Sequence, residues 1–496
     1  MNRQESLATL RANPQVAVLV VGAGVNGISV FRELALQGVD VLLVDRGDFC
    51  GGASAGSSHM AHGGIRYLEN GEFRLVREAL KERNLLIQNA PHYVQPLPTT
   101  IPIFSWFSGL FNAPLKFLRL RDKPAERGAL VIKVGMTMYD WFTRGQRSVP
   151  THNLYLRGAS LRKRPQLNPE IVCTGRYYDG FLSQPERICV EMVLDAEQDN
   201  PTARALNYLS VVDGAGDTVT LCDELTGTNY TVQPKLLINA AGPWVDFANR
   251  ALGHQTQFIG GTKGAHLVLD HPELLAATRG EEIFFENHDG RIVLILPFFD
   301  RVMVGTTDIR VEDPNQARPT EEETDYILEM IGKVFPAIQV DRSHIVYKFT
   351  GVRPLPHSST SRTGTISRDH SMREVSPDDQ VRFPVFALVG GKWTTFRAFS
   401  EQVADQVLGR LNQARKVSTA NMPIGGGRAY PTLQADQRAW LNQLEVETGI
   451  ETGRLATLFE RYGTRAADVA RYMAAGPDAP LRSLPDYTRR EIGFLA

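Results

Sequence analysis

Three glycines near the start of the chain, Gly22, Gly24 and Gly27, follow the pattern GxGxxG. In this pattern the first glycine permits a tight turn, the second lets the backbone approach a pyrophosphate, and the third lets a helix pack against a strand. The N-terminus of that helix offers N–H groups and the positive end of its dipole to phosphate. Asp45 follows about 20 residues later, where a carboxylate accepts hydrogen bonds from a ribose. The spacing predicts a dinucleotide site and does not by itself choose between FAD and NAD.

The segments around these residues have the order that such a site needs. Residues 16–21 form a short, β-branched apolar run, which is typical of a buried parallel strand. An amphipathic segment then continues to Gln37, and Gly38 is a suitable helix stop. A second apolar strand is predicted at residues 39–44 and ends at Asp45.

Other small-residue segments indicate further parts of the same site. Residues 49–64 are dense in glycine and serine, which favours contact with a ligand over a plain solvent loop. Residues 235–244 read as a buried strand that ends at a small-residue turn, where ligands bind in doubly wound sheets. Residues 386–395 repeat this pattern with a strand followed by a glycine pair. The nucleotide-binding domain is therefore predicted to be discontinuous.

The middle and the end of the chain have a different character. Residues 261–269 and 291–307 read as strands of a second, more antiparallel sheet, and residues 320–335 as a helix with acids in its first turn. The pattern after residue 400 is helical and polar, with Gly425 to Gly427 as a linker. Residues 1–14 are polar and read as a frayed terminus with no signal peptide.

Composition excludes several classes of protein. The 496 residues suggest two or three domains, and a net charge of −1 argues against a nucleic-acid binder. Four cysteines without a CxxC pair predict free thiols in a reducing compartment. The sequence contains no HExxH metal motif, no GxSxG motif and no apolar run of about 18 residues that could span a membrane. Residues 101–120 combine aromatic and basic side chains, which suits either a membrane interface or an ordinary buried subdomain.

Eight blocks in the first 400 residues carry a resemblance to a known family. They are GAGVNG (22–27), SSHMAHGGIRYLE (57–69), INAAGPW (238–244), KGAHLVL (263–269), VGTTD (304–308), TGVRPL (350–355), SRD (367–369) and GGKWTT (390–395). In these blocks and their order the sequence resembles the FAD-dependent, respiratory glycerol-3-phosphate dehydrogenases. Several blocks are far more specific than GxGxxG.

The resemblance implies an α/β fold with three parts. The first is a discontinuous GxGxxG FAD-binding domain of the glutathione-reductase or D-amino-acid-oxidase type, expected at about 16–80, 160–255 and 350–400. The second is an inserted substrate or cap domain on an antiparallel sheet, at about 81–159 and 256–349. The third is a C-terminal helical region at 401–496, shortened relative to the family, so that the natural chain is expected to be longer or its cap reduced.

The resemblance also implies an activity. FAD would accept a hydride from C2 of sn-glycerol 3-phosphate, giving dihydroxyacetone phosphate, and the electrons would pass to a quinone. The protein is then expected in the cytoplasm, peripherally on the inner face of the cytoplasmic membrane and as a homodimer, with residues 101–121 as a candidate anchor. The alternatives are a flavoenzyme for another polyol phosphate or a 2-hydroxy acid, an oxygen-using oxidase, and a flavin-binding protein that has lost catalysis.

Site residues are carried over from the matching blocks. The residues expected to bind the cofactor are Gly22, Gly24, Asn26, Gly27, Asp45, Ser57, Ser58, Gly63, Gly64, Ala240, Gly242, Gly391, Lys392 and Thr394. The substrate's phosphate end is assigned to Arg66, Tyr67, Arg368 and Lys392, because a phosphate dianion favours the planar guanidinium fork. Arg353 is assigned to the C2 oxygen, where a fixed cation stabilises a developing alkoxide. No metal site is expected.

Oxidation of a secondary alcohol also needs a base for the hydroxyl proton. His62 and His266 are the candidates, because imidazole titrates near neutral pH. The sequence does not choose between these two histidines, and each could instead be structural.

Three features depart from the family pattern. Asp45 stands where the family commonly has glutamate, which shortens the reach to the ribose by one methylene group. Residues 183–187 replace a more acidic family motif, and the loop before His59 is atypical. These departures bear on the identity of the substrate rather than on that of the cofactor.

Overall fold

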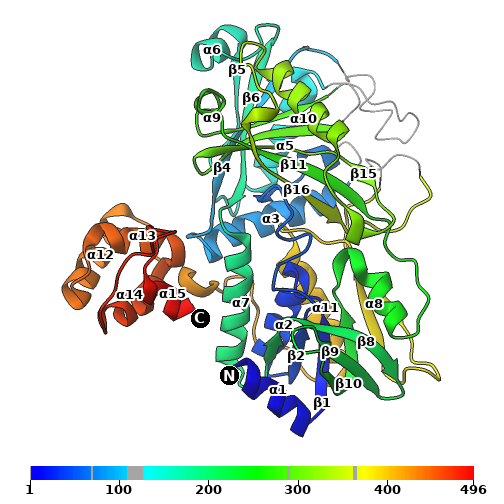
Figure 1. Cartoon of the computed structure of the whole chain (residues 1–496). Coiled ribbons are helices and arrows are strands. Elements are labelled where there is room, and N and C mark those ends of the chain that lie inside the picture. Colours follow the sequence, from blue (N-terminus) through cyan, green and yellow to red (C-terminus); the bar gives the residue numbers. More distant parts are fainter. Residues whose placement is uncertain (1, 69–70, 109–126, 288–290, 361–365, 496) are drawn as a thin grey trace.

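Two β-sheets and a C-terminal group of helices make up the molecule (Figure 1). The structure, a computed structural model, describes residues 2–68, 71–108, 127–287, 291–360 and 366–495. The first sheet lies at the bottom of Figure 1 with the N-terminal strand, and the second lies above it. Helices α12 to α15 form a separate group at one side.

The first sheet is the predicted doubly wound sheet. Its strands run in the order β17 (Ser371–Val375), β18 (Val385–Val389), β10 (Asn229–Asn239), β1 (Gln15–Val21), β2 (Val41–Val44) and β7 (Arg204–Leu206). All neighbours are parallel except β17 and β18. A hairpin of β8 (Leu209–Ala215) and β9 (Thr218–Asp223) extends from β10. The predicted strands at 16–21 and 39–44 are confirmed as β1 and β2.

Helices cover both faces of this sheet, which explains its continuous apolar strands. On one face α2 (Val25–Leu36), α7 (Pro185–Asp199) and α11 (Phe396–Arg410) share a core with the strands. On the other face the core contains Leu10 of α1 (Arg3–Ala12) and side chains of the β8–β9 hairpin. Helix α8 (Val245–Ala251) follows β10.

The prediction of a frayed N-terminus was wrong. Residues 3–12 form α1 because Asn2 and Glu5 make a reciprocal capping box at its start. Leu10 is fully buried against the sheet, and Arg3 forms an ion pair of 2.8 Å with Asp223. A polar helix with one buried face is therefore fixed by contacts distant in the sequence.

The second sheet is mostly antiparallel, as predicted. Its strands run in the order β16 (Ile345–Arg353), β11 (Thr262–Leu269), β14 (Arg301–Gly305), β13 (Ile292–Phe298), β12 (Glu282–Glu286), β4 (Val94–Ile103), β6 (Cys173–Leu182) and β3 (Met60–Ala61), with β15 (Ile309–Arg310) beside β11 and β5 (Asn153–Leu156) beside β6. Its helices are α3 (Phe73–Asn89), α5 (Ala129–Phe142), α6 (Arg157–Lys163), α9 (Pro272–Thr278) and α10 (Glu321–Val334). The helix predicted at 320–335 is α10, and a Thr320–Glu323 capping box begins it.

Strand pairing bears on two of the expected domain boundaries. Strand β6 falls within the stretch 160–255 assigned to the nucleotide-binding part, yet it pairs with β4 along its whole length. Strand β16 crosses the boundary expected at residue 350 and pairs with β11. Pairing between distant strands leaves no periodic signal in either one, so the sequence could not place them. We propose that the nucleotide-binding part resumes at α7 and again after β16.

The C-terminal helices α12 (Gln434–Thr448), α13 (Thr452–Tyr462), α14 (Ala466–Ala474) and α15 (Arg489–Leu495) share their own apolar core. Gly425 to Gly427 are not a free linker, because they form a buried turn at the junction. A Cβ on Gly426 would lie 1.9 Å from the carbonyl oxygen of Tyr462. Gly425 N–H donates to Asp195 and Gly426 N–H to Glu191, both at 3.0 Å. These glycines attach the helical group to α7.

None of the helices in the described ranges combines the length and the apolar character needed to cross a bilayer. The candidate anchor at 101–121 lies largely outside the described residues. The described part of this segment contains the last residues of β4. Trp106 and Phe107, which follow that strand, are exposed.

Candidate active site

A cavity of about 1390 Å³ lies between the two sheets. From the first sheet it is lined by the turn after β1, the turn after β2 and the small-residue turn after β10. From the second sheet it is lined by β11, β12, β13, β16 and the segment after β14. The carboxyl ends of parallel strands β1, β2 and β10 thus face this cavity, as ligand sites in such sheets do.

The glycine turn separates into packing positions and an open position. A Cβ on Gly22 would lie 2.6 Å from the carbonyl oxygen of Ala240, and one on Gly27 would lie 1.8 Å from that of Gly22. Gly22 also has a φ of +102°. A Cβ on Gly24 would meet only the Ser54 hydroxyl, at 3.3 Å. Gly24 therefore leaves space beside the first turn of α2, which is where a pyrophosphate would approach.

Asp45 holds the turn together. Its Oδ2 accepts a hydrogen bond of 2.6 Å from Ala23 N–H, and its Oδ1 accepts one of 2.8 Å from Gly47 N–H. Each carboxylate oxygen can accept a second hydrogen bond, and Asp45 lines the cavity. Its expected contact with a ribose stays a prediction.

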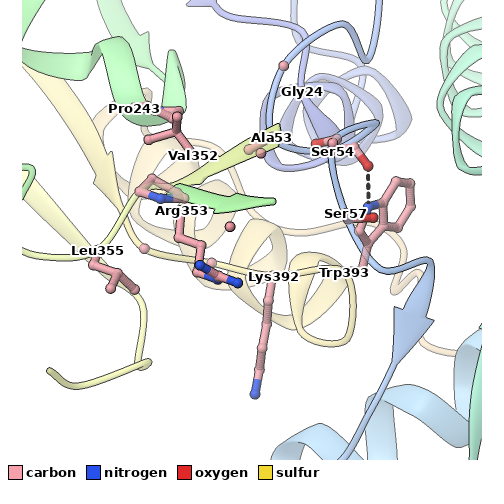
Figure 2. A pocket seen from close by; sticks show the side chains of 18 of the residues that line it. Gly24, Ala53, Ser54, Ser57, Pro243, Val352, Arg353, Leu355, Lys392 and Trp393 are labelled. Atoms are coloured by element: carbon pink, nitrogen blue, oxygen red, sulfur yellow. Dashed lines mark hydrogen bonds between the residues drawn. The ribbon is translucent and has the colours of Figure 1, made fainter. Parts of the chain in front are cut away.

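Trp393 and Thr394, which lie after β18, fix the glycine- and serine-rich loop (Figure 2). The Trp393 indole N–H donates to the Ser54 carbonyl oxygen at 2.8 Å. The Thr394 hydroxyl accepts from His62 N–H at 3.0 Å and donates to the His62 carbonyl oxygen at 2.9 Å. These hydrogen bonds hold the loop in place at the wall of the cavity.

The second sheet has one face on its core and one face toward the cavity. On β11, Ala265 and Leu267 pack in the core with α9 and α10, whereas Gly264 and His266 line the cavity. Strands β12 and β13 alternate in the same way. This period of two places Arg353 of β16 on the cavity side, next to Gly264 of β11.

Arg353 and Arg368 meet at one carboxylate. Arg353 Nη1 lies 3.2 Å from Asp308 Oδ1, and Arg368 Nη2 lies 3.4 Å from Asp308 Oδ2. Arg353 Nη2 also donates to the Thr306 hydroxyl at 3.0 Å. The VGTTD block that supplies Thr306 and Asp308 was recognised in the sequence without a role for either residue.

Lys392 brings a third cation to the cavity, which it lines together with Arg353 (Figure 2). Its Nζ is buried and has no hydrogen-bond acceptor within the described residues. It lies 4.8 Å from the centre of the Tyr67 ring, a cation–π contact. A buried ammonium without an acceptor fits an anionic or carbonyl-bearing ligand.

The two candidate bases have different surroundings. His266 Nε2 shares a hydrogen bond of 2.8 Å with the Ser58 hydroxyl, and its ring stacks on Phe349. Burial, with a further contribution from the nearby Arg353 cation, lowers the pKa of His266 to about 3. His62 also lines the cavity and has its backbone fixed by Thr394. His266 is therefore neutral near pH 7 and a weak proton acceptor.

The cavity gathers most of the residues expected from the sequence. Those that line it are Gly22, Gly24, Asn26, Asp45, Ser57, Ser58, His62, Gly64, Tyr67, Ala240, Gly242, His266, Arg353, Arg368, Gly391 and Lys392. Gly27, Gly63 and Thr394 do not line it. Gly27 packs against Gly22, Gly63 N–H donates to the buried Asp179, and Thr394 supports His62 from behind. The side chain of Arg66 lies outside the described part of the chain.

Residues 183–187 do not line the cavity. The Arg187 guanidinium lies over the Tyr462 ring at 4.5 Å, so this segment contacts the C-terminal helices. Its departure from the family motif therefore gives no reason to expect a different substrate.

One cluster at the cavity rim was not foreseen from the sequence. Arg46 stacks on the Trp244 ring at 4.6 Å, and Asn315 Oδ1 accepts hydrogen bonds from both side chains. Arg46 follows Asp45 directly, and Asn315 belongs to the short helix η3 (Pro314–Gln316) of the inserted part. The cluster joins the two parts beside the β2 turn.

Comparisons with known proteins agree with this geometry. The sequence model of the family "FAD dependent oxidoreductase" matches residues 17–388. A glycerol-3-phosphate dehydrogenase of Synechocystis sp. is 33% identical over 499 residues, covering 95% of this chain and 84% of that protein. A D-erythritol 1-phosphate dehydrogenase of Brucella abortus is 28% identical, and the alignment covers 92% of this chain and 86% of that protein. A Bacillus halodurans glycerol-3-phosphate dehydrogenase solved with FAD aligns at a TM-score of 0.71 with 23% identity, over 96% of this chain and 80% of that one.

Proposed function

Because the chain belongs to the FAD-dependent oxidoreductases, and within them to the glycerol-3-phosphate dehydrogenases, we propose that it oxidises sn-glycerol 3-phosphate to dihydroxyacetone phosphate. Its cofactor is FAD. The observation that carries the proposal is that the glycine turn and three cationic side chains, Arg353, Arg368 and Lys392, open onto one cavity. A dinucleotide and a small phosphorylated alcohol can therefore lie in contact.

We propose a role for each of these side chains. FAD, when bound, supplies the acceptor for the hydride from C2. Arg353 contacts the C2 oxygen and stabilises the charge that develops there. Arg368, Lys392, Tyr67 and Arg66 hold the phosphate. His62 takes the hydroxyl proton, because it lines the same cavity and the lowered pKa of His266, about 3, makes His266 the weaker proton acceptor.

An anaerobic absorbance titration with sn-glycerol 3-phosphate tests the substrate. The flavin band of the purified holoprotein should bleach stoichiometrically, with dihydroxyacetone phosphate formed. A quinone analogue added without oxygen should then restore the band faster than air does, because we propose a quinone as acceptor. A band that stays oxidised would contradict the substrate, and faster recovery in air would favour an oxidase.

A second polyol phosphate has one observation in its favour. The relative named D-erythritol 1-phosphate dehydrogenase matches nearly the whole chain. D-erythritol 1-phosphate therefore belongs in the same titration as a second arm. Bleaching by this compound alone would identify it as the substrate, and bleaching by neither would favour a flavin-binding protein without catalysis.

We propose that the protein works at the inner face of the cytoplasmic membrane. All four cysteines are free, as expected in a reducing compartment. Helix α5 exposes Leu130, Val134 and Trp141. They are four and seven residues apart, which places them on one side of the helix, and Lys133 is exposed between them. Apolar and tryptophan side chains beside basic ones suit the headgroup region of anionic lipids.

The expected homodimer stays a prediction that sedimentation would check.

The variant Trp141→Ser tests the membrane proposal. We expect the fraction bound to sedimented anionic phospholipid vesicles to fall about fivefold, because one large interfacial side chain is lost. Leu225→Ser is the matched control, since Leu225 is equally exposed on the β9 side of the molecule. Equal vesicle binding by both variants and the parent would contradict a membrane contact through α5.

A further inference from the structure

Asp308 occupies a position between the two arginines that the proposed reaction uses. It follows β14, whereas Arg353 ends β16 and Arg368 lies three residues before β17. Three segments distant in the sequence therefore meet at one carboxylate. All three side chains are largely buried, with exposed fractions of 20% for Asp308, 29% for Arg353 and 20% for Arg368.

The contacts leave both arginines able to bind a ligand. A guanidinium has five N–H donors. Arg353 uses two of its donors in the contacts to Asp308 and Thr306, and Arg368 uses one of its donors in the contact to Asp308. One carboxylate oxygen serves each arginine, so the two cations are held at a fixed separation. Without Asp308 the two like charges would repel each other, and their partial burial weakens the screening by solvent.

From this geometry we infer that Asp308 is a positioning residue, which holds Arg353 and Arg368 at the separation that one phosphorylated alcohol needs and limits their attraction for unreactive anions. The inference rests on the proposed function, because that function assigns the two arginines to the substrate. Asp308 itself contacts neither the reacting carbon nor the hydroxyl proton, and it acts only through the two arginines. Its negative charge lies between the two arginines and opposes their attraction for anions, so a free phosphate is bound less tightly than it would be without Asp308.

The variant Asp308→Asn separates positioning from a merely structural role. We expect kcat to fall by about a hundredfold, because a displacement of about 1 Å at the reacting centre has that effect. We expect KM to change less than kcat. Binding of inorganic phosphate to the oxidised holoprotein, measured by calorimetry, should instead become about three- to tenfold tighter, because the opposing charge is gone. A structural defect would weaken phosphate binding together with turnover.

Two further variants complete the test. Asp308→Glu keeps the charge and moves the carboxylate, so phosphate affinity should stay within about twofold of the parent while kcat falls. Asp325→Asn removes the same charge from an exposed ion pair with Arg342 elsewhere in the inserted part, and should change neither quantity. Unchanged kcat in Asp308→Asn, or weaker phosphate binding in that variant, would overturn the inference.

The phosphate measurement needs no turnover. If sn-glycerol 3-phosphate fails to reduce the parent enzyme, the proposed function fails. Tighter phosphate binding by Asp308→Asn would still show that this carboxylate controls the anion site, so the two failures are distinguishable.

Discussion

Replacing Arg353 by lysine is expected to lower kcat for sn-glycerol 3-phosphate by about a hundred- to a thousandfold, while the variant keeps its FAD. Loss of one fixed donor to a developing oxyanion has an effect of this size. The guanidinium contacts Asp308 and Thr306 with two different nitrogens, and a lysine ammonium cannot reproduce this fork. Steady-state kinetics with parallel measurement of flavin content checks the expectation.

The pH profile distinguishes this role from that of a base. The Arg353→Lys variant should lose activity at every pH and keep the shape of the profile, because arginine does not titrate in the working range. A His62→Asn variant should instead change the shape of the profile, because it removes the group that takes the hydroxyl proton. Unchanged turnover in Arg353→Lys would contradict the assignment of Arg353 to the C2 oxygen, and an unchanged profile in His62→Asn would return the base to His266.

The second large effect concerns the glycine turn. Gly24→Ala is expected to raise the Kd for FAD by about a hundredfold, roughly 2.7 kcal/mol, because its methyl group occupies the space beside the first turn of α2. The protein without FAD should keep the parent's Tm within a few degrees, since that methyl group meets only the Ser54 hydroxyl. Fluorescence titration with FAD and thermal unfolding measure both quantities.

Gly27→Ala is the contrasting variant. Its methyl group would lie 1.8 Å from the Gly22 carbonyl oxygen, so helix α2 must shift off β1. We expect the loss of folding stability to reach about 3 kcal/mol or more, and FAD to be lost as a consequence. Equal Tm values for the two variants without FAD would contradict the distinction between a packing glycine and a ligand-facing one.

Local patterns predicted the elements that carry strong periodicity. The strand, turn and helix at residues 16–37 were foreseen because each glycine has one geometric function, and α10 because its acids and its cap are adjacent in the sequence. Helix α1 was missed although Asn2 and Glu5 have capping-box spacing, since its apolar face is narrow and its partners are distant. The turn at Gly425–Gly427 was misjudged because glycine suits both flexible linkers and close packing, and only the contacts of this turn distinguish the two.

The site was predictable residue by residue but not as an arrangement. Resemblance supplied Arg353, Arg368 and Lys392, and all three line one cavity. It did not supply their connection through Asp308, because that contact joins three segments whose spacing in the sequence is irregular. Whether Gly27, Gly63 and Thr394 touch a ligand also depends on which groups pack against them or accept their hydrogen bonds, and a motif does not encode this.

The hydrogen bonds that join Ser54 to Trp393 and His62 to Thr394 have a consequence for biosynthesis. They link segments more than 330 residues apart, so the cofactor-facing loop lacks its support until most of the chain has been synthesised. Closing so long a loop is an inherently slow and late step. A nascent chain therefore presents the glycine turn well before it can retain FAD, and the supply of flavin at the end of synthesis then affects how much of the protein reaches its native state.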